Sequence, residues 1–177
     1  VGATLTVGQN LSATATANNG VINLGDLDVD GTIALTTVDA VGSGGNHATV
    51  VNAKAVKLEN STVDGNLNVT AAVGNITDTG VLTVTGTSSF TTSTTDADIK
   101  LDTTTNGFTG TVTVNTAGTA GLDDAEIHGG STLLKIIASG GVGTLKLTTI
   151  GADIIDEGAL VVTGATTIDA RGAGAAE

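Results

Sequence analysis

The sequence lacks five residue types altogether and is very poor in aromatic side chains. It contains no Cys, Pro, Met, Trp or Tyr, and its two aromatic residues are Phe90 and Phe108. Without Cys, no disulfide can stabilise the fold. A compact β-sandwich normally fills its core with large rings, because rings bury the most area per residue. Two rings are too few, so the sequence predicts a core that is narrow throughout and filled by Val, Ile and Leu, as in a solenoid.

Positive charge is also scarce. Six Lys and Arg residues stand against 18 Asp and Glu residues, which gives a formal net charge of −12. Nucleic acids and anionic membranes both require basic patches, so neither is expected as a partner. Membrane insertion is not expected either, because no apolar run approaches the ~20 residues of a spanning helix. The acidic excess favours solubility and leaves divalent cations as the ligands to consider.

The chain is rich in strand patterns. Helical periodicity is absent, and a mean hydropathy of +0.30 argues against a disordered chain. Apolar pairs at positions i and i+2 mark strands with one buried face, since successive side chains of a strand alternate across it. These pairs are Leu5/Val7, Ile22/Leu24, Ile33/Leu35, Val56/Leu58, Leu67/Val69, Leu82/Val84, Ile99/Leu101, Val112/Val114, Leu134/Ile136, Leu145/Leu147 and Leu160/Val162. The chain is therefore predicted to be all-β.

The strand pattern repeats along the chain. The segments "ITDTGVLTVTG" (Ile76–Gly86) and "IIDEGALVVTG" (Ile154–Gly164) share seven residues at an offset of 78. Successive pairs begin at intervals of 17, 11, 23, 11 and 15 along the numbering, and then at intervals of 17, 13, 22, 11 and 15. This agreement indicates a tandem duplication within one continuous domain (1–177), with periods of about 1–78 and 79–156 and a partial period at 157–177.

These features predict a parallel β-helix, that is, a β-solenoid with a 78-residue super-repeat. At roughly 20 residues per coil, each period would hold about four coils and the chain about nine, stacked at ~4.8 Å into a rod on the order of 40 Å long. An alternative remains open. A period of this length also fits two tandem immunoglobulin-like β-sandwiches, although the buried Trp and the turn prolines typical of that fold are missing.

Part of the sequence resembles a known group of exported proteins. The segment "STVDGNLNVTAAVGNITDTGVLTVTGTSSF" (Ser61–Phe90) and the phrase "NGFTGTVTV" (Asn106–Val114) are similar to repeats of filamentous haemagglutinin-like bacterial exoproteins. The resemblance extends over essentially the whole chain and departs at "AGLDDAEIHGGSTLLKII" (Ala120–Ile137) and in the acidic first loop. It implies a β-helical scaffold that is secreted to the cell surface, where it serves in adhesion or matrix building without catalysis.

The sharpest local motif is "DLDVDG" (Asp26–Gly31), which matches the opening of a calcium-binding loop. It makes Asp26, Asp28 and Asp30 candidate Ca²⁺ ligands, and no other cofactor is expected. Two features oppose this interpretation. Thr37 stands where the bidentate Glu belongs, and the inward pattern of Leu27 and Val29 would spread the three carboxylates along an outward row, ~6.6–6.8 Å between neighbours. The alternative is a solvated acidic face.

A second acidic segment, "LDDAEIHG" (Leu122–Gly129), brings Asp123, Asp124, Glu126 and His128 together in sequence, and His47 lies near the corresponding place in the first period. The favoured interpretation is a surface loop rather than a metal site. An enzyme is not expected: the histidines have no Ser or Cys partner at an informative spacing, and polysaccharide-cleaving β-helices usually need aromatic platforms, whereas this chain has no Trp or Tyr and a single Arg, Arg171.

The expected function is that of a non-enzymatic, extracellular structural protein, a rod- or fibre-forming segment of a bacterial surface adhesin or exoprotein. Neither end shows a polar cap, so the partners expected are other copies of the chain, stacked end to end, or a host or matrix surface. Two alternatives are a calcium-dependent surface-layer or matrix component and an ice-binding solenoid. The second rests on threonine rows such as "TVTGT" (Thr83–Thr87), although these are not at the same place in every period.

Overall fold

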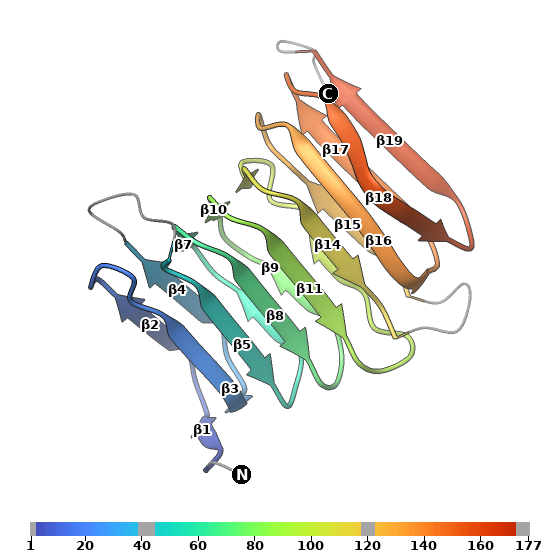
Figure 1. The fold of residues 1–177 in the computed structure, drawn as a ribbon. Helices are drawn as coiled ribbons and strands as arrows, with labels where there is room; N and C mark the ends of the chain where they lie inside the picture. The colour runs from blue at the N-terminus through green and yellow to red at the C-terminus, as the bar shows by residue number, and fades with distance from the viewer. Residues whose placement is uncertain (1–2, 39–44, 118–122, 173–177) are drawn as a thin grey trace.

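The computed structural model describes residues 3–38, 45–117 and 123–172, and these residues form nineteen strands without a helix. All pairings between strands are parallel, and they build two sheets (Figure 1). Sheet A contains, in spatial order, β1 (Leu5–Val7), β3 (Ile22–Val29), β5 (Ala48–Asn52), β8 (Leu67–Ala71), β11 (Ser88–Thr92), β14 (Val112–Asn115), β16 (Leu134–Val142) and β18 (Ile154–Val162).

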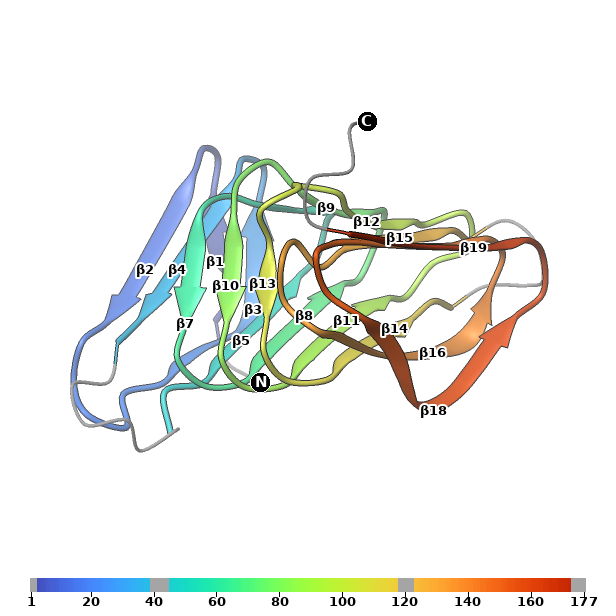
Figure 2. The same cartoon turned by 90° about the horizontal axis from the view of Figure 1, so that it is seen from above.

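Sheet B divides into two arms at one strand. Strand β2 (Leu11–Ala15) pairs with β4 (Ile33–Thr37), and β4 then pairs with the first strand of each arm. The longer arm contains β6 (Val56–Leu58), β9 (Ile76–Asp78), β12 (Ile99–Leu101), β15 (Ala125–His128), β17 (Leu145–Ile150) and β19 (Thr166–Arg171), and the shorter arm β7 (Ser61–Val63), β10 (Leu82–Val84) and β13 (Gly107–Phe108). Figure 2 shows the two arms at an angle, so the middle coils have three sides.

This architecture confirms the predicted parallel β-helix and excludes the tandem sandwiches, whose sheets are antiparallel. Each strand of sheet A lies beside the sheet A strand of the next coil, in register over several residues. For example, Leu67, Asn68 and Val69 of β8 pair with Ser88, Ser89 and Phe90 of β11. One continuous ladder therefore joins β1 to β18.

The predicted number of coils is wrong. Within the described residues, the eight strands of sheet A are separated by seven turns, fewer than the nine coils expected. One column of paired residues consists, in order, of Ile22, Ala48, Leu67, Ser88, Val112, Ile136 and Asp156, and the numbering rises by 26, 19, 21, 24, 24 and 20 from each member to the next. Most turns are thus longer than the predicted coil, because the corners hold extra residues, and the 78-residue period amounts to about three and a half turns.

A period that ends on a half turn places each strand of one copy on the opposite sheet from its counterpart in the next. Leu67 of β8 lies in sheet A, and Leu145, at the same place in the second period, lies in β17 of sheet B. Leu82 in β10 belongs to sheet B, whereas Leu160 in β18 belongs to sheet A. The duplication therefore moves each strand to the other sheet, and a strand pattern returns to its original sheet only after two periods.

The core runs along the stack as predicted. Most inward positions carry Val, Ile, Leu or Ala, with Ser61 and Ser88 among the exceptions, and Leu82 is completely buried. Leu160 is partly buried and packs against the same core. Both aromatic rings lie inside as well: Phe90 and Phe108 meet edge to face with their centroids 6.2 Å apart, a favourable arrangement for two rings.

Buried polar side chains hold the corners between the sheets. The Asn52 side chain accepts from the backbone N–H of Val29 (2.9 Å) and donates to the carbonyl oxygens of Val29 (3.1 Å) and Ala55 (2.9 Å). Asp78 accepts from Nδ2 of Asn106 at 2.6 Å and from the backbone N–H of Asp102 at 3.0 Å. These bonds satisfy corner groups that the strand ladders do not reach, and a buried backbone group without a partner would destabilise the coil.

Candidate functional site

The acidic motif of the first coil lies on the outer side of strand β3. Leu27 and Val29 are each only 1% exposed, so they point inward, as the sequence pattern predicted. The carboxylates of Asp28 and Asp30 each approach Nζ of Lys54 within 2.6 Å. Hydrogen bonds to Asp28, and then to Asp30, raise the pKa of Lys54. The ammonium group of Lys54 thus lies between these two carboxylates, where a bound cation would lie.

Asp26 is engaged separately, because its Oδ1 accepts a hydrogen bond from the Thr4 hydroxyl at 2.9 Å. Within the ranges that the structure describes, no three His, Cys, Asp or Glu side chains are grouped so that they could hold a metal ion. The calcium site at Asp26, Asp28 and Asp30 stays a prediction, and the Lys54 ion pairs favour the alternative of a solvated acidic face.

The second acidic segment is not a surface loop, and that interpretation is wrong for residues 125–128, which form strand β15. Asp123 is buried at the corner before it, where its Oδ1 accepts from the backbone N–H of Ala97 at 3.1 Å. Glu126 faces outward and pairs with Lys146 of the next coil at 2.6 Å. Leu122 lies outside the described residues. A loop was predicted because Asp and Glu are rare in strands. Strand β15 accommodates Glu126 because Lys146 of the next coil pairs with it.

The two histidines lie on different sides of the coil. His47 precedes β5 of sheet A, and its Nδ1 accepts from the backbone N–H of Asn66 at 2.8 Å. His128 ends β15 of sheet B, and its Nδ1 accepts from the backbone N–H of Gly130 at 3.3 Å. Both rings therefore support backbone, and they do not form a joint site.

His128 also lies beside a small polar hollow of about 190 Å³ on the outside of sheet B. Its walls carry both signs of charge, and they are formed by Asp102, Thr104, Glu126, His128, Lys146, Thr148 and Arg171. These residues come from four neighbouring coils, which explains why sequence reasoning did not group them. Arg171 joins them because it pairs in register with Ile150 at the end of β19.

The outer face of sheet A carries a different pattern, two rows of uncharged and mostly polar residues across consecutive coils. The first row is Thr49, Asn68, Ser89 and Thr113, and the second is Val51, Thr70, Thr91, Asn115 and Ser139. We call these residues the neutral face. The corresponding central row on sheet B is Lys57, Thr77, Lys100, Glu126, Lys146 and Thr167. Within the neutral face only Thr70 and Thr91 are threonines paired in neighbouring coils, and the other positions of the two rows mix Thr with Asn, Ser and Val.

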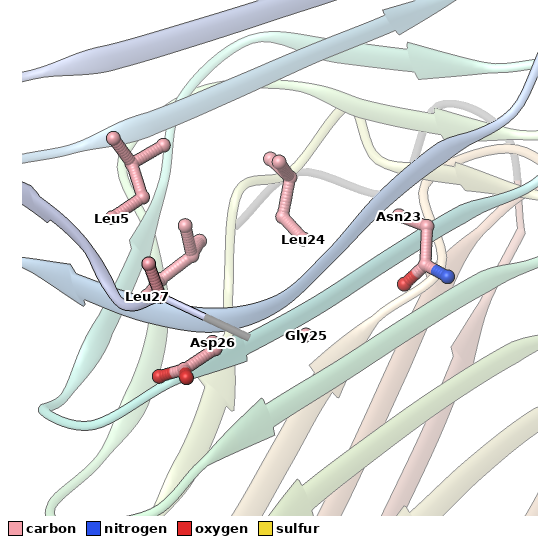
Figure 3. A pocket seen from close by; sticks show the side chains of 7 residues that line it. Leu5, Asn23, Leu24, Gly25, Asp26 and Leu27 are labelled. Atoms are coloured by element: carbon pink, nitrogen blue, oxygen red, sulfur yellow. The ribbon is translucent and has the colours of Figure 1, made fainter. Parts of the chain in front are cut away.

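Another hollow, of about 460 Å³, opens at the N-terminal end of the stack (Figure 3). Strand β1 has three residues and begins opposite Leu27, so it leaves the first half of β3 without a neighbouring strand on that side. Leu5, Leu24 and Leu27 point towards the interior side, whereas the Asn23 and Asp26 side chains point the other way. The hollow is thus lined by the buried Leu27 and the partly buried Leu24, together with exposed residues such as Leu5 and Asn23.

Comparison with known proteins identifies one family of repeats. Residues 44–115 and 117–176 each match the family model described as repeats of unknown function (DUF5649). The two matches adjoin, and together they span most of the chain. No curated protein and no solved structure matches the chain. In the part of the chain that the structure describes, no helix is long and apolar enough to cross a membrane.

Proposed function

We propose that this chain, which belongs to the DUF5649 family of repeats of unknown function, is a non-enzymatic structural rod within an extracellular bacterial surface protein. The observation that carries this proposal is the continuous parallel sheet from β1 to β18 around a narrow aliphatic core. Every inner coil is bonded to the coil before it and the coil after it, so bending the rod would break several backbone hydrogen bonds at once.

The surroundings of the charged groups support a scaffold rather than a reaction centre. Lys54, Lys100 and Lys146 each lie within 2.9 Å of an acidic side chain on the rod surface. Exposed pairs of this kind add little to stability, and each of these cations is engaged by an acidic group of the rod itself. The similarity to filamentous haemagglutinin-like repeats supports the extracellular setting and a role in adhesion or matrix building.

The proposal is tested in the producing cell with a matched pair of variants. Leu82→Asp places a charge in the core and should unfold the rod, whereas Thr83→Asp, at the outward neighbour, should leave it folded. We expect antibodies against the chain to label intact cells, and we expect Leu82→Asp alone to reduce attachment to surfaces. Labelling found only after cell lysis, or attachment that survives loss of the folded rod, would refute the proposal.

Negative-stain microscopy of the purified chain separates a fibre subunit from a stalk. A fibre subunit gives long filaments of uniform width from the protein alone. A stalk gives short, separate rods.

The neutral face favours a second candidate, an ice-binding solenoid. Its two rows are free of charge, and they repeat at the coil spacing of ~4.8 Å, as a surface that orders water would require. Thermal hysteresis decides this question. Activity that falls with Thr70→Lys/Thr91→Lys, but not with Thr77→Lys on sheet B, would support ice binding, and an absence of hysteresis in the unmodified chain would exclude it.

A further inference from the structure

The polar hollow of about 190 Å³ beside His128 is recessed into the outer face of sheet B. His128 and Thr148 directly follow the buried, inward residues Ile127 and Leu147, so their side chains point outward. They are nevertheless only 8% and 7% exposed, and both line the hollow, of which they form the floor. Strands β15 and β17, which carry them, each have a paired strand on both sides. The hollow therefore lies on the side of the rod and not at its end.

The acids and bases that line the hollow are separated by sign along the stack. Asp102 directly follows β12, and Glu126 lies in β15. Lys146 lies in β17, and Arg171 ends β19. These four strands are neighbours in the order β12, β15, β17 and β19. Both acids therefore stand at one end of the hollow and both bases at the other, and their formal charges balance within a chain whose net charge is −12.

Each of these four charged groups also has a partner of opposite sign on the rod, and the pairs are open to solvent. The pairs are Lys100–Asp102 at 2.9 Å, Glu126–Lys146 at 2.6 Å and Asp169–Arg171 at 2.6 Å. Their side chains are between 30% and 54% exposed. Exposed ion pairs contribute little to stability, so a charged ligand can share or replace these partners without unfolding the coil.

A ligand with a single charge fits only half of this hollow. A cation drawn to the two acids meets the like charges of the two bases beside them, and an anion meets the reverse together with the net negative charge of the chain. A molecule that carries both charges can place each one beside its opposite. The volume of about 190 Å³ is smaller than the ~300–1,000 Å³ of sites for drug-sized ligands, so it suits a molecule of the size of one amino acid.

We propose that this hollow binds a small zwitterion, such as a free α-amino acid. The ammonium group of the ligand lies towards Asp102 and Glu126, and its carboxylate lies towards Lys146 and Arg171. The hydroxyl of Thr148 on the floor can donate a hydrogen bond to that carboxylate. This inference rests on the charges and shape of one hollow and not on the extracellular role proposed above, so either can fail without the other.

The test is an NMR titration of the isotopically labelled chain with L-alanine as the probe. Three control compounds are added at the same ionic strength: propionate, which lacks the ammonium group, ethylammonium, which lacks the carboxylate, and glycerol, which lacks both charges. We expect L-alanine to shift the amide signals of residues 126–128 and 146–148 along one saturable curve. Each control should bind at least about tenfold more weakly, because it loses the contacts of one or both charges.

Two lysines of the same outward row on sheet B provide matched variants. Lys146→Gln removes a base that lines the hollow, and we expect it to weaken the binding of L-alanine about fivefold. Lys57→Gln removes a lysine of β6, outside the hollow, and should leave the affinity unchanged. Glu126→Lys/Lys146→Glu keeps the net charge but places one acid and one base at each end of the hollow. It should also weaken binding, while an unchanged melting temperature shows that the fold is retained.

Four results would overturn the inference. The first is the absence of a saturable shift with L-alanine, and the second is a saturable shift confined to another part of the chain. The third is binding of propionate, ethylammonium or glycerol as tight as that of L-alanine, which would indicate a site for an anion, a cation or an uncharged polyol. The fourth is equal binding of L-alanine by Lys146→Gln and Lys57→Gln.

Discussion

The two periods of the chain place matched residues in unlike surroundings. Leu82 is fully buried in β10 of sheet B, whereas Leu160, its counterpart, is only partly buried in β18 of sheet A. Asp78 is 7% exposed at an inner corner, and its counterpart Asp156 is exposed on the last coil. The same local pattern thus specifies a strand with an inner and an outer side. The number of residues per turn decides which sheet the strand joins, and its place in the stack decides how far it is covered.

The largest effect is expected from truncating the matched leucines. Leu82→Ala removes a completely buried side chain and should lower the free energy of unfolding by about 2–5 kcal/mol, through lost burial and the cavity left behind. Leu160→Ala should cost less than half as much, because its side chain is already partly in water. Urea denaturation followed by circular dichroism measures both. Equal losses would show that the final coil is as well covered as the middle of the stack.

A smaller effect is expected from the matched aspartates. Asp78→Ala leaves Nδ2 of Asn106 and two backbone N–H groups, those of Asp102 and Thr103, without their acceptor, at a cost of about 1–3 kcal/mol. Asp156→Ala alters an exposed position and should change stability by no more than about 0.5 kcal/mol. A loss at Asp156 as large as that at Asp78 would contradict the difference in burial.

The pH dependence of the same pair sharpens the comparison. Burial raises the pKa of Asp78, and its hydrogen bonds, first among them that from Asn106, only partly oppose this. Between the ordinary aspartate pKa and this raised value, the folded chain binds more protons than the unfolded chain, so its stability falls as pH increases through that range. Asp78→Ala should lose this part of the pH slope and Asp156→Ala should keep it, as measured by melting temperature between pH 3 and pH 7.

The smallest effect is expected at the acidic row of β3. Lys54→Gln frees Asp28 and Asp30 from their common cation, and the change in melting temperature should be slight and should vanish at high salt, since the pairs are exposed. Calorimetric titration with Ca²⁺ should give no heat for the unmodified chain or for Lys54→Gln. Heat that appears only in Lys54→Gln would show that the carboxylates can hold calcium once Lys54 is removed.

Sequence reasoning reached the fold because the core pattern is local. The apolar pairs and the shortage of rings both act within one coil, and pairs of the middle coils are buried as predicted, as Leu82 and Val84 show, whereas Leu5 in the first coil is 45% exposed. The number of turns was missed because it depends on the residues at the corners. The corners are held by polar side chains such as Asn52 and Asp78, which also bond to neighbouring coils: Asn52 to Val29, 23 residues away, and Asp78 to Asn106, 28 residues away.

The groups of residues on the outer surface could not be predicted from the sequence for the same reason, because they also depend on the length of each turn. The neutral face and the hollow beside His128 each draw residues from several coils, so their members come together only once the register is known. The assignment of β15 to a loop failed because Glu126 has its partner, Lys146, in the following coil. An outward row becomes visible in sequence only when the length of each turn is known, and these lengths differ, as the long turn 22–48 and the short turn 48–67 show.

The half-turn period is tested most directly by cysteine pairs, which this Cys-free chain accepts without competing thiols. Asn68 and Ser89 are register partners on sheet A, whereas Asn68 and Lys146 are one full period apart and lie on opposite sheets. We predict that Asn68→Cys/Ser89→Cys forms an intramolecular disulfide under mild oxidation and that Asn68→Cys/Lys146→Cys does not, because a disulfide requires Cα atoms within about 7 Å. A disulfide between positions 68 and 146, with none between 68 and 89, would contradict the account.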